Sequence, residues 1–385
     1  MWRAIASNAL TLFVVLIFLA GGVVLWGKEQ YRAEGPLTEA ICVRVPSGER
    51  LSAVSEELEE RGAVTSGAIL RIGADYTEKT DQLKAGSFLV PPGASMEEIV
   101  DIVTRGGANT CGTEIVYRIG VNRESVQVRE LDPATGRYVE MAEFDPTEGA
   151  EPPAEFTTMR ARGDTRYRVT VAEGVTSWQV IEGLKFVDVL EGEVPARPAE
   201  GTLAPDSYEV RPGDDRAALV AQMETAQAAL LASAWENRAS DLPYASPEEV
   251  LVMASIIEKE TGVAEERDQV ASVFVNRLNQ GMRLQTDPTV IYGITNGEGV
   301  LGRGLRRSEL DRATPYNTYV IEGLPPTPIA NPGRASLLAA VNPADTDYIF
   351  FVADGSGGHA FATNLEDHNR NVAAWREIEA SRQNQ

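Results

Sequence analysis

The chain contains 385 residues, of which 43% are hydrophobic. That length excludes a single small domain and allows two or three domains, each with its own buried core. The 57 acidic residues outnumber the 35 basic residues and give a formal net charge of -22. Binding to a nucleic-acid backbone requires a basic surface that neutralises phosphates, so this charge balance argues against nucleic acid as a partner.

The first residues of the chain predict a membrane-spanning helix. No charged residue occurs in 4–27, and Arg3 and Lys28 bracket this stretch. About 20 apolar residues are enough for a helix to cross the hydrocarbon core of a bilayer. We therefore expect a cytoplasmic tail at 1–8, a transmembrane helix at 9–27 and a soluble body after it.

A cleaved signal peptide is the alternative interpretation, because small residues at 20–22 follow an apolar stretch. We favour the membrane anchor, since the apolar run continues past that point to Trp26. Charge does not decide the orientation of the helix, because Lys28 and Arg32 after it offset Arg3 before it.

Cys42 and Cys111 are the two cysteines of the chain. They can form a disulfide bond, as in a protein of an oxidising compartment, or both can be free thiols. Their number and spacing do not choose between these states.

A pattern of a strand, a glycine turn and a helix occurs three times. Two apolar residues alternate before a glycine, and three positions at helical spacing follow it. Each unit can bury only one face, so the first two copies predict a small α+β module at 40–107 in which they cover each other. The copies are Val43, Val45, Gly48, Leu51, Val54 and Leu58; Phe88, Val90, Gly93, Met96, Ile99 and Val103; and Val169, Val171, Gly174, Ser177, Val180 and Leu184.

The segment 108–165 interrupts this pattern. Apolar residues at 126–131 and 138–141 flank an Asp-Pro-Ala-Thr-Gly turn and predict a hairpin. The stretch 148–153 is rich in Glu, Gly and Pro, which is typical of a linker. We therefore interpret 108–165 as an inserted hairpin and linker without chemistry of its own.

A helix from Pro247 to about residue 260 carries the candidate catalytic residue. Ser246 and Glu249 predict a capping box, and proline suits the first helical position. Glu258 continues an apolar stripe on this helix, and burial raises the pKa of a carboxyl group, as a general acid requires. Glu260 points roughly 200° away around the helix, so the two carboxylates cannot share a groove.

The sequence around this helix resembles the endolytic murein transglycosylase family, also called MltG or YceG-like. The matching segments include ASIIEKET at 254–261, VASVFVNRL at 270–278, GMRLQTDPTVIYG at 281–293, TPYNTY at 314–319, GLPP at 323–326, IANPG at 329–333 and FFVADG at 350–355. The resemblance implies an α+β catalytic domain at 166–380 in which Glu258 is the essential residue.

The module at 40–107 resembles the LysM-like module of the same family through residues 83–93, Leu-Lys-Ala-Gly-Ser-Phe followed by Leu-Val-Pro-Pro-Gly. LysM modules bind N-acetylglucosamine polymers. A packing or spacer role without a sugar site is the alternative. The expected fold class is therefore α+β, with one transmembrane helix, a small LysM-like module and a larger YceG-like domain.

The implied reaction cleaves nascent peptidoglycan strands between N-acetylmuramic acid and N-acetylglucosamine, leaves 1,6-anhydro ends and so terminates glycan elongation. Hydrolytic glycosidases usually need two carboxylates. A lytic transglycosylase uses the 6-hydroxyl of the substrate as nucleophile, so Glu258 alone can act as acid and then as base. Polar and aromatic groups that suit a sugar make five residues candidate substrate contacts: Gln285, Thr286, Asp287, Tyr316 and Asn317. Each can instead be a turn or core residue.

We expect no metal and no cofactor. His359 and His368 are the only histidines and are isolated from each other. The segment 354–358 lies between two apolar runs and lacks the lysine of a phosphate-binding loop, so it predicts a loop between strands.

Two rival functions remain. One is a muramidase-type hydrolase with Asp287 or Glu260 as second carboxylate, and the other is a non-catalytic scaffold that binds glycan or the synthesis machinery. The resemblance places a single-pass protein in the inner membrane, with the catalytic domain on the periplasmic side. Its expected partners are glycan strands, the membrane and, as candidates, peptidoglycan synthases.

Overall fold

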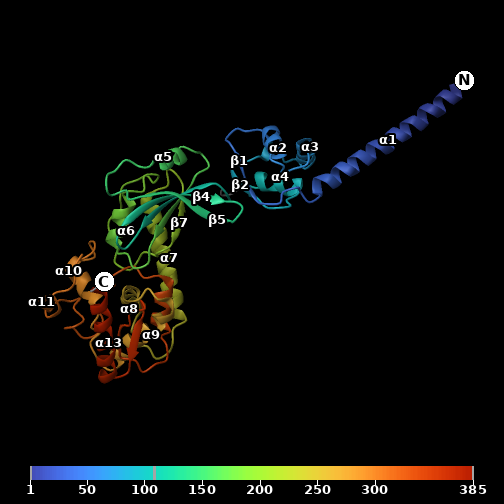
Figure 1. Cartoon of the computed structure of the whole chain (residues 1–385). Coiled ribbons are helices and arrows are strands. Elements are labelled where there is room, and N and C mark those ends of the chain that lie inside the picture. Colours follow the sequence, from blue (N-terminus) through green and yellow to red (C-terminus); the bar gives the residue numbers. More distant parts are fainter. Residues whose placement is uncertain (1, 107–109, 384–385) are drawn as a thin grey trace. The chain divides into compact units, whose positions relative to one another are not determined.

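The computed structural model describes residues 2–106 and 110–383, which mix helices and strands as predicted (Figure 1). The chain forms two compact units. The first comprises 1–115, 127–144 and 151–166, and the second comprises 116–126, 145–150 and 167–385.

The first unit begins with the long helix α1 (Trp2–Arg32). Its segment Leu10–Arg32 has a mean hydropathy of 2.5 and is long and apolar enough to cross a membrane. Within the described part of the chain it is the one helix that meets this criterion. The apolar side chains along it, such as Phe18 and Leu25, are exposed, as expected of a helix surrounded by lipid.

After α1, a small α+β module confirms two copies of the predicted repeat. Strand β1 (Ile41–Val45) leads to α2 (Leu51–Glu60), and β2 (Gly86–Val90) leads to α4 (Met96–Thr104). The glycine turns at Gly48 and Gly93 have φ of +79° and +69°, a left-handed conformation that favours glycine. The strands pair antiparallel with Val43 opposite Phe88, and both helices share one core. Helix α3 (Gly67–Tyr76) and a short turn, η1 (Thr80–Gln82), lie between the two copies.

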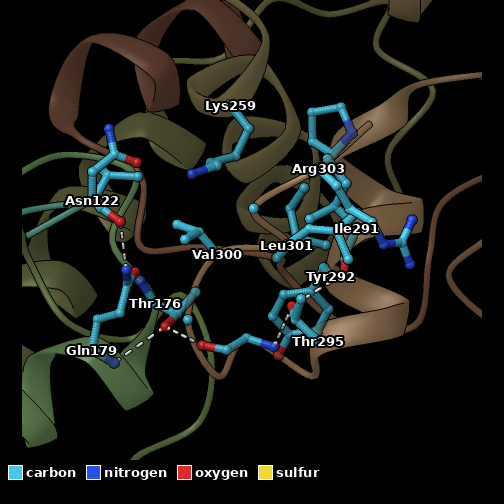
Figure 2. A pocket seen from close by; sticks show the side chains of 16 residues that line it. Asn122, Thr176, Gln179, Lys259, Ile291, Tyr292, Thr295, Val300, Leu301 and Arg303 are labelled. Carbon is cyan, nitrogen blue, oxygen red and sulfur yellow. Dashed lines mark hydrogen bonds between the residues drawn. The ribbon is translucent and has the colours of Figure 1, made fainter. Parts of the chain in front are cut away.

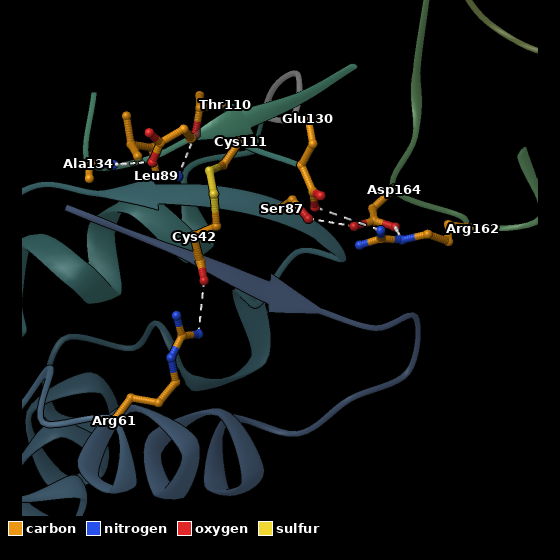
Figure 3. The surroundings of a disulfide bond; sticks show 11 residues. Cys42, Arg61, Ser87, Leu89, Thr110, Cys111, Glu130, Ala134, Arg162 and Asp164 are labelled. Carbon is orange, nitrogen blue, oxygen red and sulfur yellow. Dashed lines mark hydrogen bonds and ion pairs between the residues drawn. A yellow bond between two sulfur atoms is a disulfide. The ribbon is translucent and has the colours of Figure 1, made fainter. Parts of the chain in front are cut away.

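A disulfide bond joins Cys42 to Cys111, whose Cα atoms are 5.7 Å apart (Figure 3). The bond settles the question that the sequence left open. It connects β1 to the segment that follows α4 across a sequence separation of 69 residues. By chain entropy, closing a loop of this length stabilises the folded state by about 4 kcal/mol. Arg61 reinforces this corner by donating from Nη1 to the Cys42 carbonyl at 2.8 Å.

A five-stranded sheet has the order β5-β4-β3-β6-β7. Its strands are β3 (Thr113–Ile119), β4 (Glu124–Asp132), β5 (Arg137–Phe144), β6 (Arg166–Val171) and β7 (Ser207–Val210). Strands β4 and β5 confirm the predicted hairpin. Strand β6 and α6 (Ser177–Leu184) confirm the third copy of the repeat, with Gly174 at φ +78° between them.

The interpretation of 108–165 as hairpin and linker was incomplete. It missed β3 and α5 (Ala154–Arg160). Six of the seven residues of β3 are buried, so the strand lacks the alternation of apolar and polar residues by which the hairpin was recognised. Helix α5 has only seven residues, too few for a helical period to stand out. Residues 107–109 lie outside the described residues.

Helices around α8 (Pro247–Glu260) form the core of the second unit. All residues from Val250 to Ile257 are buried, and each fully buried Ile or Leu side chain contributes about 1.5–3 kcal/mol. The helix starts as predicted, with proline in the first turn, but the capping box does not form: Ser246 makes no capping bond, and Glu249 accepts from the Ala245 nitrogen instead. The surrounding elements are α7 (Arg216–Glu236), η2 (Ala264–Glu266), α9 (Arg267–Asn279), α10 (Asp287–Thr295), α11 (Arg307–Leu310) and α12 (Arg334–Val341).

The chain ends in a hairpin and a helix. Strands β8 (Phe350–Ala353) and β9 (His359–Ala362) pair antiparallel, and 354–358 joins them as predicted. Helix α13 (Leu365–Gln383) packs against this hairpin.

Candidate active site

Glu258 lies in the last turn of α8, where the buried stripe of the helix reaches a partly exposed surface. Its Oε2 accepts a hydrogen bond of 2.9 Å from the backbone nitrogen of Gly333, the N-cap residue of α12. The N-terminus of a helix carries partial positive charge, which favours a carboxylate there. No described residue donates to Oε1 of Glu258. One oxygen is thus held in place and the other is available to a ligand.

Glu173 is a second carboxylate at this place, which the sequence did not predict. A Cβ built on Gly333 would lie 1.8 Å from Oε1 of Glu173, so this carboxylate lies directly over the Gly333 Cα. Burial raises the pKa of Glu173, and the charge of Glu258 raises it further, while Arg267 lowers it. The lone carboxylate expected from the sequence is therefore one of a pair.

One signal in the sequence could have pointed to Glu173. It occupies the position before the turn glycine of the third repeat, where the other two copies have Ser47 and Pro92. The third copy of the repeat thus has an acidic residue at a position where the first two copies have a neutral one. Its distance of 85 positions from Glu258 hid the relationship.

Two backbone segments hold the pair together. Gly174 donates to the Asn331 carbonyl at 3.0 Å, and Asn331 donates to the Val175 carbonyl at 2.8 Å. The side chain of Asn331 is fully buried and accepts from the Leu203 nitrogen. The turn at Gly174, which has φ of +78°, packs onto α8: a Cβ there would be in van der Waals contact with Cγ of Glu258 at 3.6 Å.

A cavity of about 310 Å³ adjoins this turn. Figure 2 shows Asn122 and Gln179 on one side of it, Tyr292 and Arg303 on the other, and the side chain of Lys259 between them. Lys259 donates to the Gly174 carbonyl at 3.1 Å, and among the described residues it makes no ion pair. Burial lowers the pKa of Lys259, while Glu258 and Glu200 oppose that shift. An ammonium group with unused donors thus faces the cavity next to the carboxylate pair.

Glu260 has surroundings different from those of Glu258, as the helical geometry predicted. It accepts a short hydrogen bond from Oγ1 of Thr286, and burial raises its pKa. Thr286 is itself buried and donates from its backbone nitrogen to Oγ1 of Thr318. The predicted substrate contact Thr286 therefore ties the end of α8 to a loop, and its hydroxyl is already used.

The neighbours of Thr286 are more accessible. Gln285 is exposed, has φ of +49° and donates from its backbone to the Thr318 carbonyl. Asp287 is exposed at the start of α10 and accepts from the hydroxyl of Tyr319 at 2.7 Å. Both side chains can meet a ligand at the surface.

Tyr316 and Asn317 have contrasting positions. Tyr316 is partly exposed, and its ring centroid lies 5.0 Å from that of Tyr292, which lines the cavity. Asn317 is fully buried, and its Nδ2 donates to three carbonyls at 309–312, the end of α11 and the loop that follows it, while its Oδ1 accepts from the Tyr319 nitrogen. The structure gives Asn317 a role in shaping the loop, which differs from the predicted contact with substrate.

The two histidines have separate protein partners. His359 is 2.9 Å from Glu266 through Nδ1, and the ring of His368 stacks on Phe350 with centroids 4.9 Å apart. Across the described ranges, no group of three or more His, Cys, Asp or Glu side chains is placed to hold a metal ion.

Comparison with known proteins gives a family match that covers this site. The sequence pattern of the YceG-like family matches residues 118–374, a range that begins within the segment expected to be an insertion. A Bacillus subtilis (strain 168) protein named endolytic murein transglycosylase is 29% identical over 363 residues, which are 91% of this chain and 89% of that protein.

A Streptococcus pneumoniae serotype 2 protein of the same name is 27% identical over 339 residues. The match covers 86% of this chain and 58% of the pneumococcal protein. A crystal structure of a yceG-like protein, lmo1499 from Listeria monocytogenes, is 25% identical with a TM-score of 0.45, and the match covers 86% of this chain and 99% of that one.

Proposed function

Because the chain belongs to the YceG-like family, we propose that it is an endolytic murein transglycosylase that cleaves peptidoglycan glycan strands internally. The observation that carries this proposal is the carboxylate of Glu258, which the Gly333 nitrogen holds by one oxygen at 2.9 Å while the other stays available. Glu258 then protonates the glycosidic oxygen between N-acetylmuramic acid and N-acetylglucosamine. The resulting carboxylate takes the proton of the 6-hydroxyl as that oxygen attacks C1, which leaves a 1,6-anhydro end.

The contacts of Gly333 support a catalytic role for Glu258. A general acid must hold its proton-bearing oxygen in a fixed direction, and the bond from Gly333 restricts rotation of the carboxyl group. Cleavage also turns a neutral acid into a carboxylate. The partial positive charge at the start of α12 favours that charge as it develops.

Glycan recognition is proposed for the surface around the cavity. Asp287 and Gln285 are exposed and Tyr316 is partly exposed, whereas Thr286 and Asn317 are buried and act on the loop. Lys259 and the amide of Asn122, which both line the cavity, suit the acetamido and lactyl oxygens of the sugars. The role of the N-terminal module in glycan binding stays a prediction.

We also propose that α1 anchors the protein in the inner membrane, with the catalytic unit on the periplasmic side. The disulfide bond between Cys42 and Cys111 supports this side, because such bonds persist in oxidising compartments. A tether keeps the enzyme near strands as they are made, so it can end their elongation, and peptidoglycan synthases are its candidate partners.

The test is a digest of isolated glycan strands by the purified full-length protein, followed by mass spectrometry of the products. Internal cuts with 1,6-anhydro ends are expected. Glu258→Gln should lower the rate 10²- to 10⁴-fold, because it removes the general acid. Glu224→Gln, at an exposed position of α7, is the matched control. Reducing muramic ends would instead indicate a hydrolase, and no cleavage by the wild type would favour a scaffold.

A further inference from the structure

The end of α1 is fixed to the N-terminal module by several contacts. The ring of Tyr31 is buried against Gly73 of α3, where a Cβ would lie 2.3 Å from the ring. Arg32 forms an ion pair of 3.2 Å with Glu97 of α4. Three residues further on, the Gly35 nitrogen donates to the Gly93 carbonyl at 3.0 Å. The helix therefore passes into the module without a flexible linker, and its direction sets that of the module.

The face of α3 beside this junction is exposed and apolar. The exposed fraction is 70% for Ile72 and 83% for Tyr76, the two highest values for large hydrophobic side chains outside α1 in the described part of the chain. Ile72 and Tyr76 are four residues apart and therefore neighbours on the helix surface. Gly73, the residue that receives Tyr31, directly follows Ile72 in the chain and precedes Tyr76 by three residues. Single exposed apolar residues need no explanation, but this pair occurs where the anchor helix meets the module.

The position of this face along α1 corresponds to the surface of a bilayer. The apolar run ends at Gly27, and Lys28 is the first charged residue after it. Tyr31 lies four residues after Gly27, which is about 6 Å along a helix that rises 1.5 Å per residue. The polar layer on each side of the hydrocarbon core is roughly 5–8 Å thick. Side chains level with Tyr31 thus fall within that layer, where tyrosine is enriched because its ring is apolar and its hydroxyl is polar.

We propose that Ile72 and Tyr76 are seated in the lipid headgroup layer and hold the N-terminal module against the membrane that α1 crosses. This inference rests on the proposed membrane anchor. This contact gives the module a fixed orientation at the bilayer surface, because α1 supplies one attachment to the membrane and the exposed face of α3 supplies a second. Contact with lipid through apolar and aromatic side chains requires no basic patch, which agrees with the acidic composition of the chain.

The experiment uses the full chain in vesicles of phosphatidylethanolamine and phosphatidylglycerol. Because Cys42 and Cys111 are joined, a single introduced cysteine is the one reactive thiol and can carry an environment-sensitive dye. The dye is attached in separate variants at Tyr76→Cys, at Leu16→Cys within the apolar helix, and at Ser52→Cys. Ser52 is an exposed position of α2, whereas α1 packs against α3 and α4. Lipids that carry a quencher in the headgroup or in mid-chain then report depth.

Headgroup quencher should reduce the emission of the dye at Tyr76 and leave that at Ser52 unchanged, while mid-chain quencher reduces that at Leu16. If the dye at Leu16 is quenched but the dye at Tyr76 behaves like that at Ser52, α1 is in the membrane and the proposed contact of Tyr76 with lipid is wrong. A face of α3 that is covered by another protein would give this result. If the dye at Leu16 is not quenched, both the membrane anchor and the contact of α3 with lipid are wrong.

A second variant tests the cause without changing the exposed face. Gly73→Val places a side chain where the Tyr31 ring lies and should release the module from α1. Headgroup quenching at Tyr76 should then decrease while mid-chain quenching at Leu16 stays. Unchanged quenching at Tyr76 would contradict the proposed dependence on the junction between Tyr31 and Gly73.

Discussion

Glu173 and Glu258 lie against the same residue: the carboxylate of Glu173 covers the Cα of Gly333, and that of Glu258 accepts from its nitrogen at 2.9 Å. Burial raises the pKa of Glu173, and the charge of Glu258 raises it further, so a proton on Glu173 is favoured where the two groups meet. A general acid benefits from such a neighbour, since the proton has to stay on the pair until the glycosidic bond breaks.

Glu173→Gln should therefore reduce activity without abolishing it. We expect kcat/KM to fall about tenfold, far less than the 10²- to 10⁴-fold of a lost general acid. The raised pKa of Glu173 should give the wild type a limb in its pH profile that is missing in Glu173→Gln. The measurement is kcat/KM on glycan strands against pH. A loss as large as that of Glu258→Gln, together with reducing ends from the wild type, would make Glu173 the second carboxylate of a hydrolase.

The stability of the protein should respond to the same substitution in a pH-dependent way. Burial raises the pKa of Glu173 above its ordinary value of 4.5, so its contribution to stability is present below that pH and is lost as pH rises through the folded-state pKa. Glu173→Gln should leave Tm unchanged at acidic pH and raise it at neutral pH. Thermal unfolding at both pH values checks this. The exposed Glu224→Gln should show no such difference, and a lower Tm for Glu173→Gln at neutral pH would contradict the prediction.

Gly333→Ala tests whether the contact itself matters. Its Cβ would lie 1.8 Å from Oε1 of Glu173, so the carboxylate has to move. We expect a loss of about 1–3 kcal/mol in the free energy of unfolding and a fall in kcat, because the displaced Glu173 disturbs Glu258. Gly262→Ala is the matched control, since a Cβ there meets nothing within 4 Å. Equal effects of the two substitutions on activity would show that the packing at Gly333 is not needed.

The sequence predicted what depends on local order along the chain. Periodicity and turn glycines were sufficient for the three strand–turn–helix units, and proline at the first turn for the start of α8. The separation of Glu258 from Glu260 followed from helix geometry alone.

Long-range relationships were beyond the sequence patterns. Glu173 reaches Glu258 because the neighbouring Gly174 and Val175 form backbone hydrogen bonds with Asn331, more than 150 positions away. The same holds for Asn317, whose side chain donates to three nearby backbone carbonyls. In the sequence, such an asparagine cannot be distinguished from one that binds a sugar. Burial distinguishes these roles, and burial is a property of the fold.

Breaking the disulfide bond should weaken the first unit. Replacing Cys42 and Cys111 together by serine should lower the free energy of unfolding by 2–5 kcal/mol, because the unfolded chain regains the freedom of a long loop. Reduction of the wild type by a thiol should give a similar decrease in Tm, whereas it should not affect the double variant. An unchanged Tm in both experiments would mean that the bond adds no stability.

Lys259 should act on substrate binding rather than on the chemical step. Its ammonium faces the cavity with one hydrogen bond, to the Gly174 carbonyl, so donors remain for an oxygen of the substrate. A hydrogen bond from a charged donor contributes about 1.5–3 kcal/mol, so Lys259→Gln should raise KM at least tenfold with kcat little changed. Lys185→Gln, at an exposed position, is the control.

The pH dependence of KM gives a second readout for Lys259. Because burial lowers its pKa, the charge is lost at a lower pH than for an ordinary lysine, and KM of the wild type should begin to rise there. The same rise should be absent in Lys259→Gln, which carries no charge at any pH. If Lys259→Gln lowers kcat and leaves KM unchanged, the ammonium acts on Glu258 and not on the glycan. The main evidence for glycan binding in the cavity would then be lost.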